Sequence, residues 1–270
     1  MGKAPRVGWT REHSLMALNL YCKLPFGQLY KGNLVIREVA SRMGRTASSL
    51  SMKLCNFAAL DPVQQARGIR GLSGTTKQDR ALWAEFQERI EVLAPESEEM
   101  LHKLFTDDEA SEVDFLERGG VRLEQARQPA VPNWPTEGTA TVRVRRGQQF
   151  FRQAILRAYG VRCCITGIPV PRLLVASHIK PWRDFPGERL NPRNGLCLSS
   201  LHDAAFDAGL ITLDEELRVV LSRRLRDYFP QQVLELNFVD YEGKEIRLPE
   251  KLAEPDPVFL AYHRDVVFSR

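Results

Sequence analysis

The sequence has few cysteines and no long apolar run. Its 270 residues include five cysteines, an odd number with three of them late in the chain, which fits a reducing compartment better than a disulfide scaffold. No apolar run approaches the about 18 residues that a membrane span needs, and no secretory apolar region is visible. We therefore expect a cytoplasmic protein without a membrane partner.

Two common ligand motifs are also missing. Cys163, Cys164 and Cys197 do not form paired Cys-x-x-Cys motifs, so we predict no structural zinc. The glycine-rich basic stretch 67–80 lacks the Gly-Lys-Ser/Thr ending of a phosphate-binding P-loop, which argues against a nucleotide cofactor. A flexible surface loop is the preferred interpretation of this stretch, and contact with DNA phosphates or the minor groove is the alternative.

Charge is distributed unevenly along a chain of ordinary composition, 43% hydrophobic and 27% charged. Residues 1–83 carry 13 Lys and Arg against 4 Asp and Glu, whereas residues 84–128 carry 5 against 13. Basic faces attract the phosphate backbone, and an acidic segment is repelled by it. The pattern predicts a basic module over 1–83, an acidic helical connector with a proline-rich linker over 84–136, and a second basic module over 137–270.

Apolar residues at helical spacing predict three helices in the first module, from Thr10 to Leu24, over 35–43, and from Thr46 onward. Thr10 and Thr46 are suited to cap the first and third helices. Ala40 and Gly44 stand where a tight turn between two helices needs a small side chain and a tolerant backbone. The second and third helices are therefore predicted to form a helix-turn-helix-like unit.

Several side chains are predicted to contact DNA. In the helix-turn-helix-like unit they are Arg45, Ser48, Ser49 and Lys53, because short hydroxyls and cations can approach base edges and phosphates. An ordinary helix pair in a globular core is the competing interpretation. The segment from 81 to about 117 reads as acidic helix, and Pro129, Pro132 and Pro135 indicate a stiff linker.

The second basic module opens with an arginine-rich stretch. Arg143, Arg145 and Arg146 precede a helix predicted over 148–159, and they are expected to contact the DNA backbone. Scattered surface arginines are the alternative. Residues 173–176 then predict a buried strand that leads directly into His178.

The stretch 177–207 carries the chemistry. It presents His178, Asn194 and His202 in a strand–loop–strand–helix context. Hydrolysis of a phosphodiester needs a base for water, a group that holds this base still, and a cation that takes up charge on the phosphate. One short element of two strands and a helix can supply all three.

Four blocks in this region stand in a characteristic order: Cys164 to Gly167, Ala176 to Trp182, Asn194 to Leu198, and Leu201 to Ile211. Together they resemble a bacterial branch of the HNH endonucleases. The resemblance implies a ββα-metal nuclease domain, so that the whole chain is expected to be α+β, with an all-helical N-terminal module and this nuclease domain at the C-terminus.

The resemblance also implies roles for single residues. His178 corresponds to the base that activates water, and Asn194 locks the loop or touches the metal. His202 would hold a divalent cation with the help of Asp207 and, as a less favoured candidate, Asp203; Mg²⁺ is the first expectation, and Mn²⁺ or another transition ion is the alternative. Lys180 is expected near the phosphate. The chain departs from the broad pattern at Ser177, where many members carry an Asp or His ligand.

The leading hypothesis is a metal-dependent endonuclease of the restriction or defence type that cuts double-stranded DNA. One such site per chain favours a homodimer or sequential nicking. A DNA-binding regulator with a decayed site is the alternative from another class, with Ser177 as its symptom. A nuclease of a mobile element is a third possibility.

Overall fold

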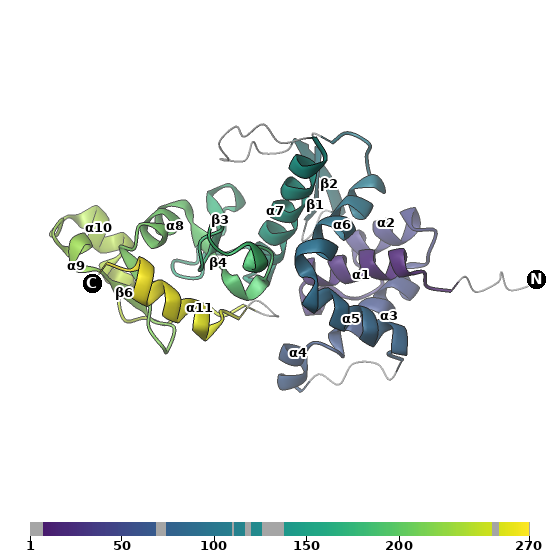
Figure 1. Cartoon of the computed structure of the whole chain (residues 1–270), viewed down its shortest axis with the longest axis horizontal. Coiled ribbons are helices and arrows are strands. Elements are labelled where there is room, and N and C mark those ends of the chain that lie inside the picture. The colour runs from purple at the N-terminus through teal and green to yellow at the C-terminus, as the bar shows by residue number, and fades with distance from the viewer. Residues whose placement is uncertain are drawn as a thin grey trace, which may run out of the picture. The chain divides into compact units, whose positions relative to one another are not determined.

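The computed structural model describes residues 8–68, 74–109, 111–116, 120–125, 138–249 and 254–269. The chain forms two compact units, residues 1–150 and 151–270, whose elements can be followed in Figure 1. Helix α7 (Gly138–Ala158) contributes residues to both units. The three-part division expected from the charge pattern stays a prediction.

The first unit is helical apart from one β-hairpin. Its other elements are α1 (Arg11–Lys23), α2 (Leu34–Arg42), α3 (Ala47–Ala58), α4 (Pro62–Ala66), α5 (Lys77–Glu88), α6 (Ile90–Lys103), β1 (Ser111–Leu116) and β2 (Gly120–Gln125). Helix α1 packs against both α3 and α6. The hydrophobic core therefore lies between the basic and the acidic parts of this unit.

The three predicted N-terminal helices and both predicted caps are confirmed. The hydroxyls of Thr10 and Thr46 accept hydrogen bonds from the His13 and Ser49 amides, each at 3.1 Å, and so pair amides that a helix start leaves open. Between α2 and α3, Gly44 adopts φ of +66°, a conformation that glycine reaches without strain. Whether this helix pair reads DNA stays a prediction.

The prediction of a helix up to about residue 117 was wrong. Residues 111–116 form β1, which pairs antiparallel with β2. Val113 and Phe115 are buried two positions apart, which is the period of a strand with one buried face. Helix α7 begins at Gly138, before the predicted start at 148. Pro129, Pro132 and Pro135 lie outside the described residues.

Acidic and basic segments pair with each other inside the first unit. Ion pairs join Lys23 to Glu98, Arg11 to Glu85, and Arg146 to Glu99. The Lys23–Glu98 pair is fully buried, and burial lowers the pKa of Lys23 while Glu98 opposes that shift. Part of the contrast in charge along the sequence is therefore cancelled by ion pairs within the fold.

The described part of the second unit contains two antiparallel strand pairs and several short helices. They are β3 (Leu174–His178), β4 (Gly195–Ser199), α8 (Ser200–Asp207), β5 (Ile211–Leu213), β6 (Val219–Leu221), α9 (Arg223–Arg226), α10 (Gln232–Asn237) and α11 (Pro257–Tyr262). β3 pairs with β4, and β5 pairs with β6. The order β3, β4, α8 is the predicted ββα element, and the expected α+β class is confirmed.

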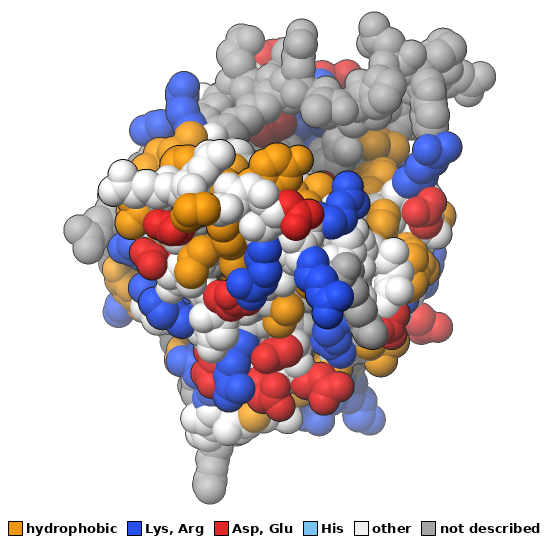
Figure 2. All heavy atoms as spheres, turned by 90° about the vertical axis from the view of Figure 1, so that its left-hand side faces the viewer, with side chains coloured by type: hydrophobic (Ala, Val, Ile, Leu, Met, Phe, Trp, Pro, Cys, Tyr) orange, Lys and Arg blue, Asp and Glu red, His pale blue; other side chains and the backbone are white. Residues whose placement is uncertain are grey.

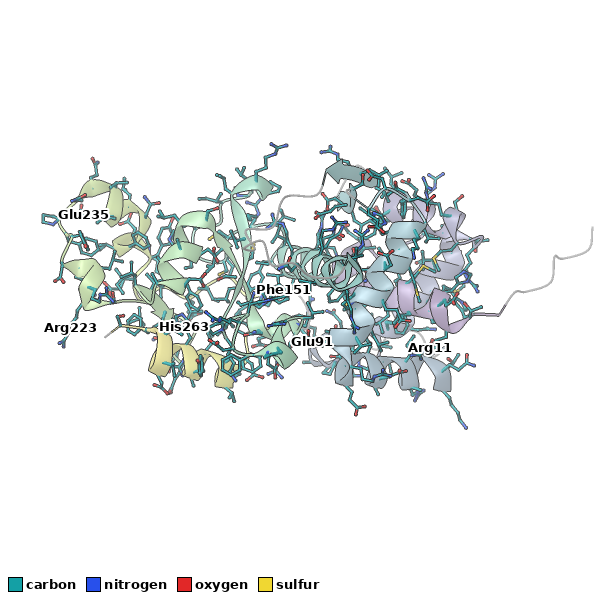
Figure 3. All side chains as sticks on the ribbon, turned by 45° about the horizontal axis from the view of Figure 1, so that its top comes forward. Arg11, Glu91, Phe151, Arg223, Glu235 and His263 are labelled. Carbon is teal, nitrogen blue, oxygen red and sulfur yellow. The ribbon has the colours of Figure 1, made fainter. Side chains whose placement is uncertain are left out.

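His263 fastens the C-terminal segment to this element (Figure 3). Its ring is buried and stacks on Phe206 with centroids 3.6 Å apart. Nε2 donates to the Phe206 carbonyl at 3.1 Å, so Nδ1 accepts from the Thr212 hydroxyl at 2.8 Å. This burial fits a structural role for His263.

The surface of the second unit carries both signs of charge. On the face shown in Figure 2, Lys and Arg side chains are interspersed with Asp and Glu side chains. Within the same unit, an ion pair joins Arg226 to Glu242. No helix among the described residues is both long enough and apolar enough to cross a bilayer.

We predict that His263 makes this unit less stable in mild acid. Burial lowers its pKa to about 4, so below about pH 6.5 the unfolded chain gains a proton that the folded chain does not bind. Stability is unaffected above that pH and falls as the pH drops towards 4. Between about pH 7.5 and 5 the loss due to His263 should be about 2 kcal/mol.

Urea unfolding at both pH values, for the wild type and His263→Gln, measures this contribution. The variant starts from a lower stability but should lose about 2 kcal/mol less on acidification. An equal loss in both proteins would show that His263 does not titrate differently in the folded state.

Candidate active site

The β3–β4 hairpin and α8 bring the three motif residues into one small element. His178 is the last residue of β3 and lies opposite Gly195, the first residue of β4. Asn194 immediately precedes β4, and His202 lies in the first turn of α8, whose N-cap is Ser199. The Ser199 hydroxyl accepts from the His202 amide at the start of α8, which directly follows β4.

The ring of His178 is held on its edge and on its face. Nε2 lies 2.9 Å from the carbonyl oxygen of Arg189, and since a carbonyl only accepts, Nε2 carries the proton. The ring stacks on Phe151 with centroids 4.0 Å apart and meets the edge of Trp182 at 5.3 Å. Nδ1 therefore keeps its lone pair in a ring of fixed orientation.

His178 is also neutral near physiological pH. Burial lowers its pKa to about 4, and the hydrogen bond to the Arg189 carbonyl opposes this shift without reversing it. A neutral imidazole with a free Nδ1 lone pair can accept a proton from water. The side chain is half-buried, so a substrate and its water are not excluded by complete enclosure.

Asn194 holds the loop that follows His178 by hydrogen bonds to Lys180 and Glu188. We call this set of contacts the Asn194 clasp. The buried side-chain oxygen of Asn194 accepts from the Lys180 amide at 2.7 Å, and its amide group donates to the carbonyls of Lys180 and Glu188 at 3.3 and 3.0 Å. Its own carbonyl accepts from the Ile179 amide at 3.0 Å. These contacts match the loop-holding role suggested by the sequence.

Gly195 is required by close packing beside this clasp. A Cβ atom there would collide with the Ile155 side chain and lie 2.9 Å from the Phe151 ring. Only a residue without a side chain allows α7 to come this near to β4. The Asn-Gly pair therefore serves packing as well as the turn.

Both ring nitrogens of His202 are engaged by the protein. Nε2 lies 2.8 Å from the Asn237 carbonyl and must donate to it, so Nδ1 accepts from the Ser199 hydroxyl at 2.8 Å. The ring is buried against Phe238, and burial lowers its pKa. No lone pair of His202 is free for a cation, which counts against the metal-ligand role expected from the sequence.

Two carboxylates of α8 are better placed for a cation. Asp203 and Asp207 are four residues apart, so they share one face of the helix. Burial raises the pKa of Asp203, and it raises the pKa of Asp207 to about 6, with the charge of Asp203 as a second cause. The Ser177 hydroxyl partly offsets the shift at Asp203.

These residues fit a divalent cation held largely by water and phosphate. The charge of Asp203 contributes to the raised pKa of Asp207, so a cation bound between the two carboxylates would relieve this repulsion. No cluster of three or more His, Cys, Asp or Glu within the described ranges could enclose a metal. Mg²⁺ commonly uses one or two carboxylates together with waters and substrate phosphates.

The predicted DNA contacts of the helix-turn-helix-like unit are only partly available at its surface. Ser48 is exposed, and Ser49 and Arg45 are half-buried. Arg45 donates to the Gly8 carbonyl at 2.6 Å and lies over the Trp9 ring. The expectation that Lys53 is exposed was wrong: it is buried and pairs with Asp79 at 2.5 Å, because a buried ammonium needs a partner.

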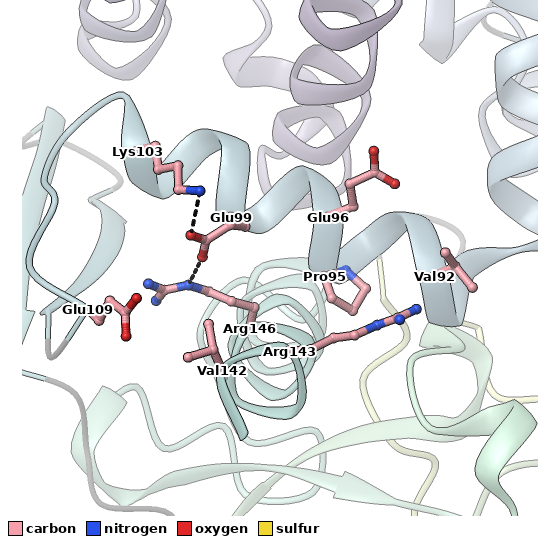
Figure 4. Close-up of a pocket in the computed structure, with 9 residues that line it drawn as sticks. All are labelled: Val92, Pro95, Glu96, Glu99, Lys103, Glu109, Val142, Arg143 and Arg146. Carbon is pink, nitrogen blue, oxygen red and sulfur yellow. Dashed lines mark hydrogen bonds and ion pairs between the residues drawn. The ribbon is translucent and has the colours of Figure 1, made fainter. Parts of the chain in front are cut away.

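The three arginines of α7 differ in environment. Arg143 is exposed, whereas Arg145 donates to the Glu109 carbonyl. The prediction that Arg146 faces DNA was wrong, since it is buried and its Nε donates to Glu99 at 2.7 Å. Figure 4 shows Glu99 between Arg146 and Lys103 in an open pocket of about 790 Å³ within the first unit.

Three features of the site were not predicted from the sequence. The Phe151 stack, the Arg189 carbonyl that sets the tautomer of His178, and the pairing of Asp203 with Asp207 on one helix face all surround the base or the cation position. Only the pairing of the two carboxylates had a signal in the sequence, their i, i+4 spacing on α8.

Cys163, Cys164 and Cys197 are buried in the same unit, and burial raises the pKa of the Cys164 and Cys197 thiols.

Comparison with models of protein families gives a match within the second unit. Residues 163–214 match a family model described as HNH endonuclease. The match spans His178, Asn194, His202 and both α8 carboxylates, and it ends before α11. No curated protein matches the chain.

We predict that Asn194→Ala destabilises the second unit by about 3 kcal/mol. The change leaves the Lys180 amide and two carbonyls without their partner, and each unsatisfied buried backbone group costs about 1–3 kcal/mol. Chemical denaturation followed by fluorescence measures the loss. Asn56→Ala, which removes hydrogen bonds that are longer on average, to the Gly74 carbonyl and the Asp79 carboxylate in the first unit, is the control and should cost under about 1 kcal/mol. Equal losses would contradict a special role for the clasp.

Proposed function

We propose that this chain, which carries an HNH endonuclease domain at residues 163–214, is a metal-dependent endonuclease that hydrolyses double-stranded DNA. The observation that carries the proposal is the state of His178. Its ring is neutral, its Nε2 proton is committed to the Arg189 carbonyl, and its Nδ1 lone pair is free. A base in this state at a strand end is what water activation requires.

Proton transfer follows from this geometry. A water beside Nδ1 of His178 loses its proton to the ring as its oxygen attacks phosphorus, and the bond from phosphorus to the leaving oxygen breaks. The Arg189 carbonyl already accepts a hydrogen bond from Nε2–H of His178. This hydrogen bond stabilises the imidazolium that forms. Asn194 keeps the following loop in place while the ring changes charge, and Phe151 keeps the ring plane fixed.

Asp207 and Asp203 would hold the divalent cation, with Mg²⁺ as the favoured ion and Mn²⁺ as an alternative. When bound, the cation supplies positive charge that stabilises the phosphate and the leaving oxygen. Ser177 occupies the position before the base, where its hydroxyl favours the ionised form of Asp203. His202 would then support the site indirectly, by holding α8 to Ser199 and to Asn237.

A restriction or defence role fits a nuclease domain joined to a separate helical unit that grips DNA. Arg45, Ser48, Ser49 and Arg143 are the contacts proposed there, and a homodimer would allow one site per chain to cut both strands. Incubation of purified protein with Mg²⁺ or Mn²⁺ and with methylated and unmethylated DNA tests this role. Cleavage of every DNA without regard to sequence or modification would contradict it.

We predict that His178→Gly lowers the rate of DNA cleavage by a factor of about 10²–10⁴, because it removes the base. Added imidazole should restore part of the rate, since a free base can enter the space left by the ring. A gel-based cleavage assay with the metal held constant measures both effects. Cleavage that persists unchanged in the variant rules out the mechanism.

We predict that Asp207→Asn weakens the apparent affinity for Mn²⁺ by about tenfold or more, because the site loses half of its carboxylate charge. Calorimetric titration of Mn²⁺ measures this in the absence of DNA. His202→Gln is the matched comparison: it should lower thermal stability, by the loss of two buried hydrogen bonds, and leave Mn²⁺ affinity within about twofold. A large loss of Mn²⁺ affinity in His202→Gln, with little loss in Asp207→Asn, would show that His202 and not Asp207 binds the cation.

A further inference from the structure

The side chain of Lys180 lies in an aromatic cage. Its ammonium is 4.6 Å from the centroid of Phe185, 4.7 Å from Phe259 and 5.6 Å from Tyr262. All three distances are within the range of an attractive cation–π contact. Phe185 and Tyr262 also meet edge to face at 4.9 Å, so two of the three rings contact each other as well as the lysine.

The backbone of the same residue is part of the Asn194 clasp. Its amide donates to the Asn194 side chain and its carbonyl accepts from it, two positions after His178. The backbone at Lys180 is therefore held twice. Asn194 bonds its amide and carbonyl, and the Lys180 side chain connects it to the rings of α11. Two of the three rings, Phe259 and Tyr262, belong to α11.

Helix α11 is anchored a second time beside the clasp. Its N-cap residue, Asp256, pairs with the Arg193 guanidinium at 3.0 Å, and the Asp256 amide donates to the Arg193 carbonyl at 3.0 Å. Arg193 directly precedes Asn194. The helix therefore contacts the chain next to both partners of the clasp, although it lies outside the segment matched by the nuclease family.

We propose that Lys180 is a positioning residue, and that the cage on α11 fixes through it the loop that sets the orientation of His178. This inference rests on the proposed nuclease function and reassigns Lys180 from the direct phosphate contact expected from the sequence. An ammonium that touches phosphate contributes to binding of DNA. An ammonium held by three rings contributes instead to the geometry of the base.

Lys180→Met tests the proposal, because it keeps the length of the side chain and removes its charge. Amide exchange of residues 179 and 180 should accelerate about tenfold as the clasp opens more often. The turnover rate kcat should fall about tenfold with KM within about twofold, as expected for a misplaced base. Lys180→Arg should recover most of both, since a guanidinium also stacks on aromatic rings.

Two further variants test whether the effect comes from the aromatic cage: one removes a ring of the cage, and one removes a lysine outside it. Phe185→Leu removes one half-buried ring without touching the lysine and should shift exchange and kcat in the same direction. Lys244→Met removes an ammonium that lies 5.8 Å from the Tyr241 ring elsewhere in this unit, and it should change neither quantity.

The opposite results are equally specific. A raised KM, an unchanged kcat, unchanged exchange and a salt dependence weaker by about one phosphate contact would overturn the proposal in favour of direct DNA contact. Absence of cleavage by the wild type with every metal would instead overturn the nuclease function. Amide exchange would still be informative then, because unchanged exchange in Lys180→Met would overturn the positioning role by itself.

Discussion

The Asn194 clasp is the interaction on which the candidate site depends. One buried amide side chain satisfies an N–H and two carbonyls of a loop that has no strand partner of its own. Buried backbone groups without partners are costly, so the loop from His178 to Asn194 has one strongly preferred path. That path places the Arg189 carbonyl against the His178 ring. The protonation state of the base is thus a consequence of how a loop satisfies its hydrogen bonds.

Burial works in opposite directions on the two kinds of group in this site. It lowers the pKa of His178 and raises the pKa of Asp203 and Asp207, since a poorly solvated environment disfavours charge of either sign. For the histidine this gives a neutral base. For the carboxylates it gives a pair that gains from a cation. The same physical cause therefore prepares both halves of a hydrolytic site.

Several positively charged side chains of the first unit stabilise the fold and are not exposed for binding a partner. Lys23, Lys53 and Arg146 are all buried, and each is paired with a carboxylate. Breaking a buried pair is strongly destabilising, so these cations are not available to DNA. The cations left for binding are those at the surface, such as Arg143. A net charge counted along a sequence therefore overstates the electrostatic attraction that the folded unit can exert.

The sequence by itself determined the local elements and the order of the site. Helical periodicity and capping threonines placed α1, α2 and α3, and the spacing of His178, Asn194 and His202 indicated two strands followed by a helix. These features depend on residues near one another in the chain, where propensity and hydrogen bonding act directly.

Only the tertiary structure decided what each polar side chain contacts. Arg146 meets Glu99, which is 47 positions away, His202 meets the Asn237 carbonyl, and Lys180 meets the rings of α11. A lysine or histidine has the same chemistry at the surface and in the core, and its role is set by partners that the local sequence does not specify. Long-range packing chooses those partners, and so it decides which candidates are free to act on a substrate and which hold the protein together.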